Sequence, residues 1–259
     1  MELVKLFRNI KENFFFSAVF LATLVGGILA MIYKPLLPEV EILKGTFWLF
    51  GLSLQATVII LWIGGYLLYR WNLGKRKNST QLVWGVSFLL YSVVFIGMAL
   101  QALGFGFADA KLPWIFFVYR QFMILWLAGI YWGLAGIVFA KENRLARILP
   151  TAAILLIGYG IFANGLFIVK DVEYTMYSFL YLLFVPVCFI LSRIFWKYAQ
   201  LASATFARYL SIGFAGIGIT YLAWAPWHKT TFYFVWFFLY VLSLIPLLVG
   251  FLGAGQKST

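Results

Sequence analysis

The sequence predicts an all-helical bundle that crosses a membrane about eight times, and three observations lead to this prediction. First, 64% of the 259 residues are hydrophobic and only 11% are charged, whereas soluble chains are about half apolar and a quarter charged. Second, the chain divides into eight apolar runs, each close to the roughly 20 residues that cross a bilayer as a helix. Third, loops rich in Lys and Arg alternate with loops poor in them, which is typical of membrane proteins.

Turn-forming or charged residues separate the eight runs. Pro35 and Pro38 follow the first run, the segment 72–80 (NLGKRKNST) follows the second, and the segment 141–150 (KENRLARILP) follows the fourth. The first run has a basic start but no small-x-small cleavage site after it, so we expect a retained helix rather than a signal peptide. The predicted spans are Phe14–Tyr33, Phe47–Tyr69, Leu82–Phe105, Leu112–Ala140, Ile148–Val169, Tyr174–Phe195, Thr205–Pro226 and Thr231–Gly253.

The basic residues set the predicted orientation. If the N-terminus is cytoplasmic and the chain crosses eight times, fourteen of the 20 Lys and Arg lie on the inner side, five lie on the outer side, and Arg120 lies within a span. Lys and Arg collect on the cytoplasmic side, so both termini are predicted to be cytoplasmic, in a multi-pass protein of the cell (plasma) membrane. We expect residues 1–44 to form one helix with its outer loop, and residues 45–259 to form a seven-helix bundle.

Several function classes lack the residues that they need. No Asp or Glu lies inside any predicted span, which argues against paired carboxylates and carboxylate-bound metals. His228 and Cys188 are the only His and Cys, so we expect no haem, no metal site and no intrachain disulfide, and Cys188 is predicted to be a buried, inert thiol. Phosphate-binding G-x-x-x-x-G-K-[ST] loops and G-x-S-x-G elbows are missing. The net charge of +12 is spread over short loops, which argues against nucleic-acid binding. We expect a protein that is not an enzyme.

Arg120 is the most informative single residue. It follows Pro113 by seven positions, so it lies roughly 10 Å into the fourth predicted span, where a charge costs about 2.5–3.5 kcal/mol. Such a residue is expected to face the bundle interior and to pair with glutamine side chains, backbone carbonyls, water, an acid of the outer loops or an anionic ligand. The alternative is that its side chain extends to the outer membrane surface.

Other polar residues favour the same outer half of the membrane. Gln55 lies in the second span, Gln101 lies near the outer end of the third, and Gln121 follows Arg120. Together these positions predict a pocket that opens outward and holds a hydrophobic or anionic small molecule; the alternative is that each side chain makes its own interhelical hydrogen bond. The predicted ligand-binding residues are Arg120, Gln55, Gln101, Gln121, Asn164 and His228.

Aromatic residues make up 21% of the chain, and several lie deep in the predicted spans, among them Trp126, Tyr221 and Tyr240. Such rings suit a flat hydrophobic ligand such as a quinone, a polyene or a lipid, with close packing as the alternative. Glycines recur at Gly129 and Gly133 of the fourth span, and small residues let helices approach closely.

Without the first predicted helix, seven helices remain, starting outside and ending inside. The third of them, LPWIFFVYRQFMILW (residues 112–126), carries Arg120 in its outer half, and the helix before it, LVWGVSFLLYSVVFIGM (residues 82–98), has a similar general character. This pattern resembles microbial rhodopsins and other seven-helix receptors over about residues 45–253, and the resemblance implies a seven-helix frame. Opsins carry a retinal-binding lysine in the last helix and carboxylates in the third and last helices. Those residues are missing here, so no retinal Schiff base is expected.

The sequence therefore predicts a receptor-like membrane protein or binding subunit that holds a small molecule. A non-catalytic accessory subunit of a larger membrane complex is the first alternative. A small-solute transporter is the second, although the mid-span prolines Pro186 and Pro246 have no counterparts in the first half of the chain. The expected partners are the lipid bilayer and a separate membrane or cytoplasmic chain that docks on the basic inner loops, Arg70–Lys77 and Lys141–Arg147.

Overall fold

The computed structural model describes residues 47–74, 78–102, 119–138, 144–227 and 233–256. Within these ranges the regular structure is entirely helical, as the sequence predicts. Helices suit a bilayer because each satisfies its own backbone hydrogen bonds, which lipid cannot do. The first predicted span, Phe14–Tyr33, lies outside the described residues, so the total of eight spans and the separate N-terminal part stay predictions.

Seven helical segments cover the other predicted spans. Six are long and apolar enough to cross a membrane, whereas α6 has only 17 residues, and the predicted span Leu112–Ala140 is described only from residue 119 to residue 138. Two spans contain π-helical turns that the sequence did not predict. The elements are α3 (Phe47–Leu73), α4 (Ser79–Ala102), α6 (Phe122–Val138), α7 (Arg144–Ala163) with η2 (Asn164–Val169), α8 (Val172–Phe179) with η3 (Leu180–Phe184) and α9 (Val185–Leu201), α10 (Thr205–Trp227), and α11 (Tyr233–Gln256).

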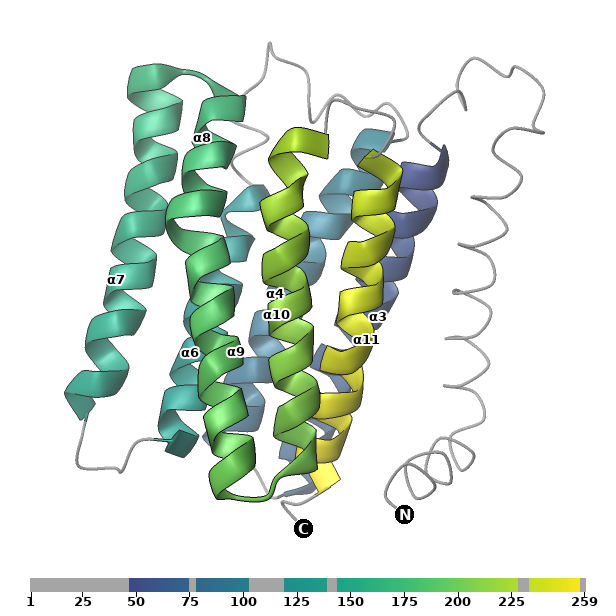
Figure 1. Ribbon diagram of the computed structural model, residues 1–259, viewed down its shortest axis with the longest axis vertical. Helices are drawn as coiled ribbons and strands as arrows, with labels where there is room; N and C mark the ends of the chain where they lie inside the picture. Colours follow the sequence, from purple (N-terminus) through teal and green to yellow (C-terminus); the bar gives the residue numbers. More distant parts are fainter. Residues whose placement is uncertain (1–46, 75–77, 103–118, 139–143, 228–232, 257–259) are drawn as a thin grey trace.

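The seven segments run up and down in a closed ring (Figure 1). Each helix packs on the next in chain order, and α11 returns to pack on α3. Short connections favour such antiparallel neighbours. The ring therefore has two ends: the starts of α3, α8 and α11 form one end, and the starts of α4, α7 and α10 form the other.

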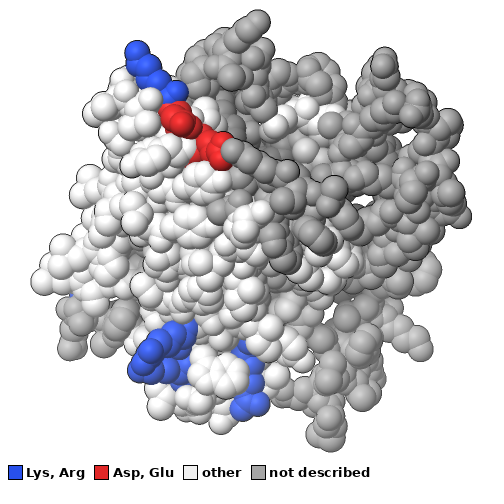
Figure 2. Space-filling model, turned by 45° about the horizontal axis from the view of Figure 1, so that its top comes forward, with Lys and Arg blue, Asp and Glu red and all other residues white. Residues whose placement is uncertain are grey.

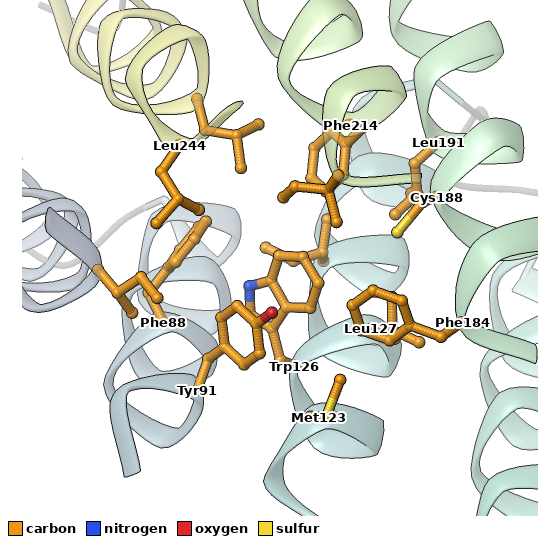
Figure 3. Close-up of a cluster of buried hydrophobic side chains, with 14 of the residues drawn as sticks. Phe88, Tyr91, Met123, Trp126, Leu127, Phe184, Cys188, Leu191, Phe214 and Leu244 are labelled. Atoms are coloured by element: carbon orange, nitrogen blue, oxygen red, sulfur yellow. The ribbon is translucent and has the colours of Figure 1, made fainter. Parts of the chain in front are cut away.

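Aromatic side chains fill the middle of the ring. Trp126 of α6 is fully buried and stacks on Tyr91 of α4, with 4.2 Å between the ring centroids. Phe184 of η3 and Phe214 of α10 lie against the same indole, each with a centroid distance of 5.9 Å. Figure 3 shows these rings converging from separate helices. Among the described residues, the deep aromatic side chains thus pack against one another. From the sequence, such close packing was the alternative to binding a flat hydrophobic ligand.

Glycines bring two pairs of helices close together. A Cβ at Gly133 of α6 would overlap Trp84 Nε1 of α4, and a Cβ at Gly213 of α10 would lie 2.6 Å from Leu247 of α11. The Trp84 indole cannot easily move away, because its Nε1 donates a 3.0 Å hydrogen bond to the carbonyl of Ile130. These positions require the absence of a side chain.

The helix α7 lies at the edge of the bundle and is the least buried of the six long spans. Arg147 ties its start to α6: its Nε donates to the carbonyl of Trp132 at 3.1 Å, and its guanidinium lies 4.0 Å from the Trp132 ring centroid. Leu156, Phe167 and Ile168 are each more than 70% exposed. An outward apolar face of this kind is stable in hydrocarbon, so α7 presents it to lipid.

Pro186 accounts for the π-helical turn η3. Proline has no N–H and its ring collides with the carbonyl four residues earlier. Just before it, the N–H of Val185 bonds to the carbonyl of Leu180, five residues back. This wider turn absorbs the disruption, so α8, η3 and α9 continue as one span from residue 172 to residue 201.

The charges divide between the two ends of the ring. Lys170, Asp171 and Glu173 lie at the start of α8 and just before it, and the only described acids are this Asp and Glu. Figure 2 shows the acidic side chains at one end and further basic side chains at the other. The described basic residues at the opposite end are Arg70, Arg144, Arg147, Arg193, Lys197 and Arg208. This separation agrees with the predicted topology, while the cytoplasmic position of the basic end stays a prediction.

The Gly133→Ala substitution is expected to lower the free energy of unfolding by about 1–3 kcal/mol, because the added methyl overlaps the Trp84 indole. The matched control is Gly65→Ala in α3, where a Cβ meets nothing within 4 Å and alanine is the better helix former by about 1 kcal/mol. Thermal unfolding in detergent, followed by circular dichroism, measures both. Equal stability of the two variants would contradict this account of the α4–α6 contact.

Candidate functional site

Arg120 lies at the start of the described part of the α6 span and is half-buried. Its guanidinium carbon is 5.2 Å from the ring centroid of Tyr119. The positive charge therefore lies where the α6 span begins, at the same end of the bundle as the starts of α3, α8 and α11 (Figure 1).

Gln101 and Gln121 lie beside Arg120. The Tyr119 hydroxyl donates a 3.4 Å hydrogen bond to Gln101 Oε1, which links α4 to the start of the α6 span. The Gln121 carbonyl accepts a 2.9 Å hydrogen bond from the N–H of Ile124, and its side chain is half-buried. Three of the six predicted site residues, Arg120, Gln101 and Gln121, thus lie together at one end of the ring.

The other three predicted site residues lie elsewhere. Gln55 of α3 is 2% exposed and its Oε1 has no hydrogen-bond partner. Asn164 is exposed on η2, at the end of the peripheral helix α7 and outside the Arg120 group. His228 lies outside the described residues. The structure therefore brings three of the six predicted residues together, and the pocket itself stays a prediction.

Three buried tyrosines, absent from the predicted site, carry polar groups into the interior. The hydroxyls of Tyr91 and Tyr240 are 2.7 Å apart, and the ring of Tyr221 of α10 packs edge-on against Tyr240 with 5.4 Å between the centroids. The three residues are at most 2% exposed. Helical periodicity could have identified two of them as buried, because buried residues recur every three or four positions. Tyr91 falls in such a row on α4, and Tyr240 falls in one on α11. The rows are Trp84, Phe88, Tyr91 and Phe95, and Phe237, Tyr240 and Leu244.

The indole N–H of Trp126 lies in the middle of the ring. The indole N–H groups of Trp84 and Trp236 donate to the carbonyls of Ile130 and Thr220, whereas Trp126 Nε1 is buried without a hydrogen-bond partner in the part of the chain that the structure describes. A buried donor left unpaired costs about 1–3 kcal/mol. Trp126 Nε1 and Gln55 Oε1 are therefore interior polar atoms with bonding capacity left.

The described side chains around Arg120 carry hydrogen-bonding groups and a positive charge. Within the described ranges, no three His, Cys, Asp or Glu side chains come close enough to hold a metal ion. Cys188 of α9 is fully buried, and Figure 3 shows it among Phe184, Leu191 and other apolar side chains. Arg120 and the Trp126 indole carry N–H groups and are hydrogen-bond donors, whereas the hydroxyls of Tyr91 and Tyr240 bond to each other.

Comparisons with protein-family models, with curated proteins and with solved structures found no match for this chain. The resemblance to microbial rhodopsins consequently stands on topology alone, and what the structure supports is the coarser statement of a helical membrane bundle.

Removing one hydroxyl of the Tyr91–Tyr240 pair is expected to destabilise the protein by about 1–3 kcal/mol, because it leaves a buried partner unsatisfied. In the double variant Tyr91→Phe/Tyr240→Phe, the loss should be smaller than the sum of the two single losses, because their shared bond is then removed only once. Thermal unfolding of all four proteins measures this coupling. Tyr69→Phe, at a position 60% exposed, serves as the control; strictly additive losses would contradict direct pairing.

Proposed function

We propose that this chain is a non-catalytic, receptor-like binding protein of the cell membrane that holds a hydrophobic small molecule with an anionic or hydrogen-bond-accepting head. The observation that carries the proposal is the placement of the half-buried Arg120 guanidinium next to Tyr119, whose hydroxyl donates a hydrogen bond to Gln101 of α4. A carboxylate, a phosphate or a quinone carbonyl is the complementary group for such donors.

The surroundings of Arg120 support a head group at this position. A charge at this depth of a bilayer is costly, and a bound anion offsets that cost more strongly than it would in water, because the local dielectric constant is low. The half-buried side chains of Gln101 and Gln121 add polar groups at the rim. The head group would therefore meet polar side chains from α4 and from the start of the α6 span.

A flat apolar tail would lie against the aromatic side chains of the interior, which pack on one another in this structure, so its entry requires these rings to move apart. Tyr91 bonds to Tyr240 and stacks on Trp126. Trp126 Nε1 has no hydrogen-bond partner among the described residues and would donate to a polar group on that tail. Quinones, polyenes with a polar end and lipid acids share this form, and the aromatic walls suit them through ring stacking. The seven-helix ring would then serve as the frame of a sensor or of a binding subunit that works with a partner chain.

Arg120→Leu is expected to abolish retention of the bound compound while the protein stays folded. The measurement is mass spectrometry of an organic extract from the detergent-purified protein, after its visible spectrum has been recorded. Arg144→Leu is the matched control, since Arg144 is exposed at the opposite end of the ring. Arg120→Lys should retain part of the binding, because the charge remains while the planar donor geometry is lost.

A stoichiometric compound in the unsubstituted protein and in Arg144→Leu, lost from Arg120→Leu, would support the proposal. Equal retention in both variants would contradict it. Bulk phospholipid alone in every extract would favour the accessory-subunit alternative, which co-purification of a stoichiometric partner chain then tests. Uptake of a solute by reconstituted vesicles would favour the transporter.

A further inference from the structure

A second recognition site lies on the lipid-facing side of α9 and α10, at the end of the ring opposite to Arg120. The hydroxyls of Ser192 and Ser211 are 3.0 Å apart, and the Ser211 hydroxyl also approaches the carbonyl of Ser192 at 2.9 Å. These contacts fix where the two antiparallel helices face each other. They also fix the relative heights of the basic residues that follow.

Arg193 and Arg208 turn to the same outer side of this helix pair. Successive residues of a helix are about 100° apart around its axis, so Arg193 lies about 100° from Ser192 around α9. Arg208 precedes Ser211 by three residues, which places it about 60° from Ser211 around α10. Because the two helices are antiparallel, both rotations lead to the same outer side of the pair. Their exposure agrees with this geometry, since both arginines are exposed while Leu191 and Leu210, on the opposite side, are fully buried. By helix rise they differ in height by only about 3 Å.

Two further side chains, Lys197 and Trp196, lie at this level, and together with Arg193 and Arg208 they form a surface that we call the polar shelf. Lys197 follows Arg193 by one helical turn and is exposed, and Trp196, 47% exposed, lies on the groove side between the two arginines. Lys197 is four residues from the end of α9, and Arg208 is three residues from the start of α10. That depth corresponds to the head-group layer, where tryptophan and basic residues concentrate.

The charge of this shelf is not balanced by nearby acids in the described part of the chain. Asp171 and Glu173 are the described acids, and they lie at the other end of the ring. Figure 2 shows this separation of acidic and basic side chains. Within the described residues the shelf therefore carries a net positive charge, which an anionic group would complement.

The surface continues from the shelf towards the middle of the membrane as an apolar track. Phe189 of α9 and Ile212 of α10 are 36% and 53% exposed on the same outer side of the helix pair. Ile219, further along α10, is 59% exposed. An occupant with a charged head and a long hydrocarbon chain would satisfy both parts of this surface, whereas a soluble anion would satisfy only the shelf.

We propose that Arg193, Arg208, Lys197 and Trp196 form a binding site for the head group of an anionic phospholipid, whose acyl chain lies along Phe189 and Ile212. The arginines would bind the phosphate through paired N–H donors, and the tryptophan would hold the glycerol region at the interface. Because this site is at the other end of the ring, it does not depend on the proposed role of Arg120.

The test is native mass spectrometry of the full chain titrated with phosphatidylglycerol, with phosphatidylcholine and with soluble glycerol phosphate. We expect phosphatidylglycerol to bind tightly, phosphatidylcholine weakly, and glycerol phosphate not at all at matched concentrations. The double variant Arg193→Gln/Arg208→Gln should lose affinity for phosphatidylglycerol by about 25-fold, at about fivefold for each basic side chain removed. The double variant Arg193→Lys/Arg208→Lys keeps both positive charges, so it should keep most of the affinity for phosphatidylglycerol that depends on charge.

Arg144→Gln provides the control, because Arg144 is exposed at the same end of the ring but on α7. An equal loss of affinity in this control and in the double variant would overturn the site and leave only a general attraction to the basic end. If glycerol phosphate and phosphatidylglycerol bind equally well, the acyl chain contributes nothing, and the proposal that the site binds a lipid is overturned. If the double variant does not fold, Lys197→Gln and Arg208→Gln are each expected to weaken binding about fivefold, and unchanged affinity in both would equally overturn the proposal.

Discussion

The indole of Trp126 fills the middle of the seven-helix ring, and the neighbouring segments take their positions around it. Tyr91 stacks on one face at 4.2 Å, and Phe184 and Phe214 approach from η3 and α10. Between helices in lipid there is no hydrophobic driving force, so shape complementarity has to hold the bundle together. Large rings at the centre and glycines at the contacts of α4 with α6 and of α10 with α11 supply that complementarity.

Polar groups in this interior are few, and each has a definite place. The Tyr91–Tyr240 pair is hydrogen-bonded across α4 and α11. Among the described residues, Trp126 Nε1 and Gln55 Oε1 are buried without hydrogen-bond partners, and unpaired buried polar atoms cost free energy.

The apolar outside and the charged ends have a different role, because they match the protein to the bilayer. The helix α7 exposes Leu156, Phe167 and Ile168, which lipid covers, and its attachment depends on Arg147 against Trp132. At the basic end, α9 and α10 place two arginines and a tryptophan at one level. The two proposed sites therefore lie at opposite ends of one ring and can be tested separately.

The sequence by itself determined the helical membrane class and the positions of six spans to within a few residues, because apolar run length and loop charge are local properties of the chain. Only the tertiary structure decided which polar residues meet. It joined Gln101 to Arg120 through Tyr119, left Asn164 exposed on η2, and paired Tyr91 with Tyr240, which are 149 residues apart. Such meetings depend on the rotation and height of each helix in the ring, and those follow from side-chain packing between distant segments rather than from spacing along one segment.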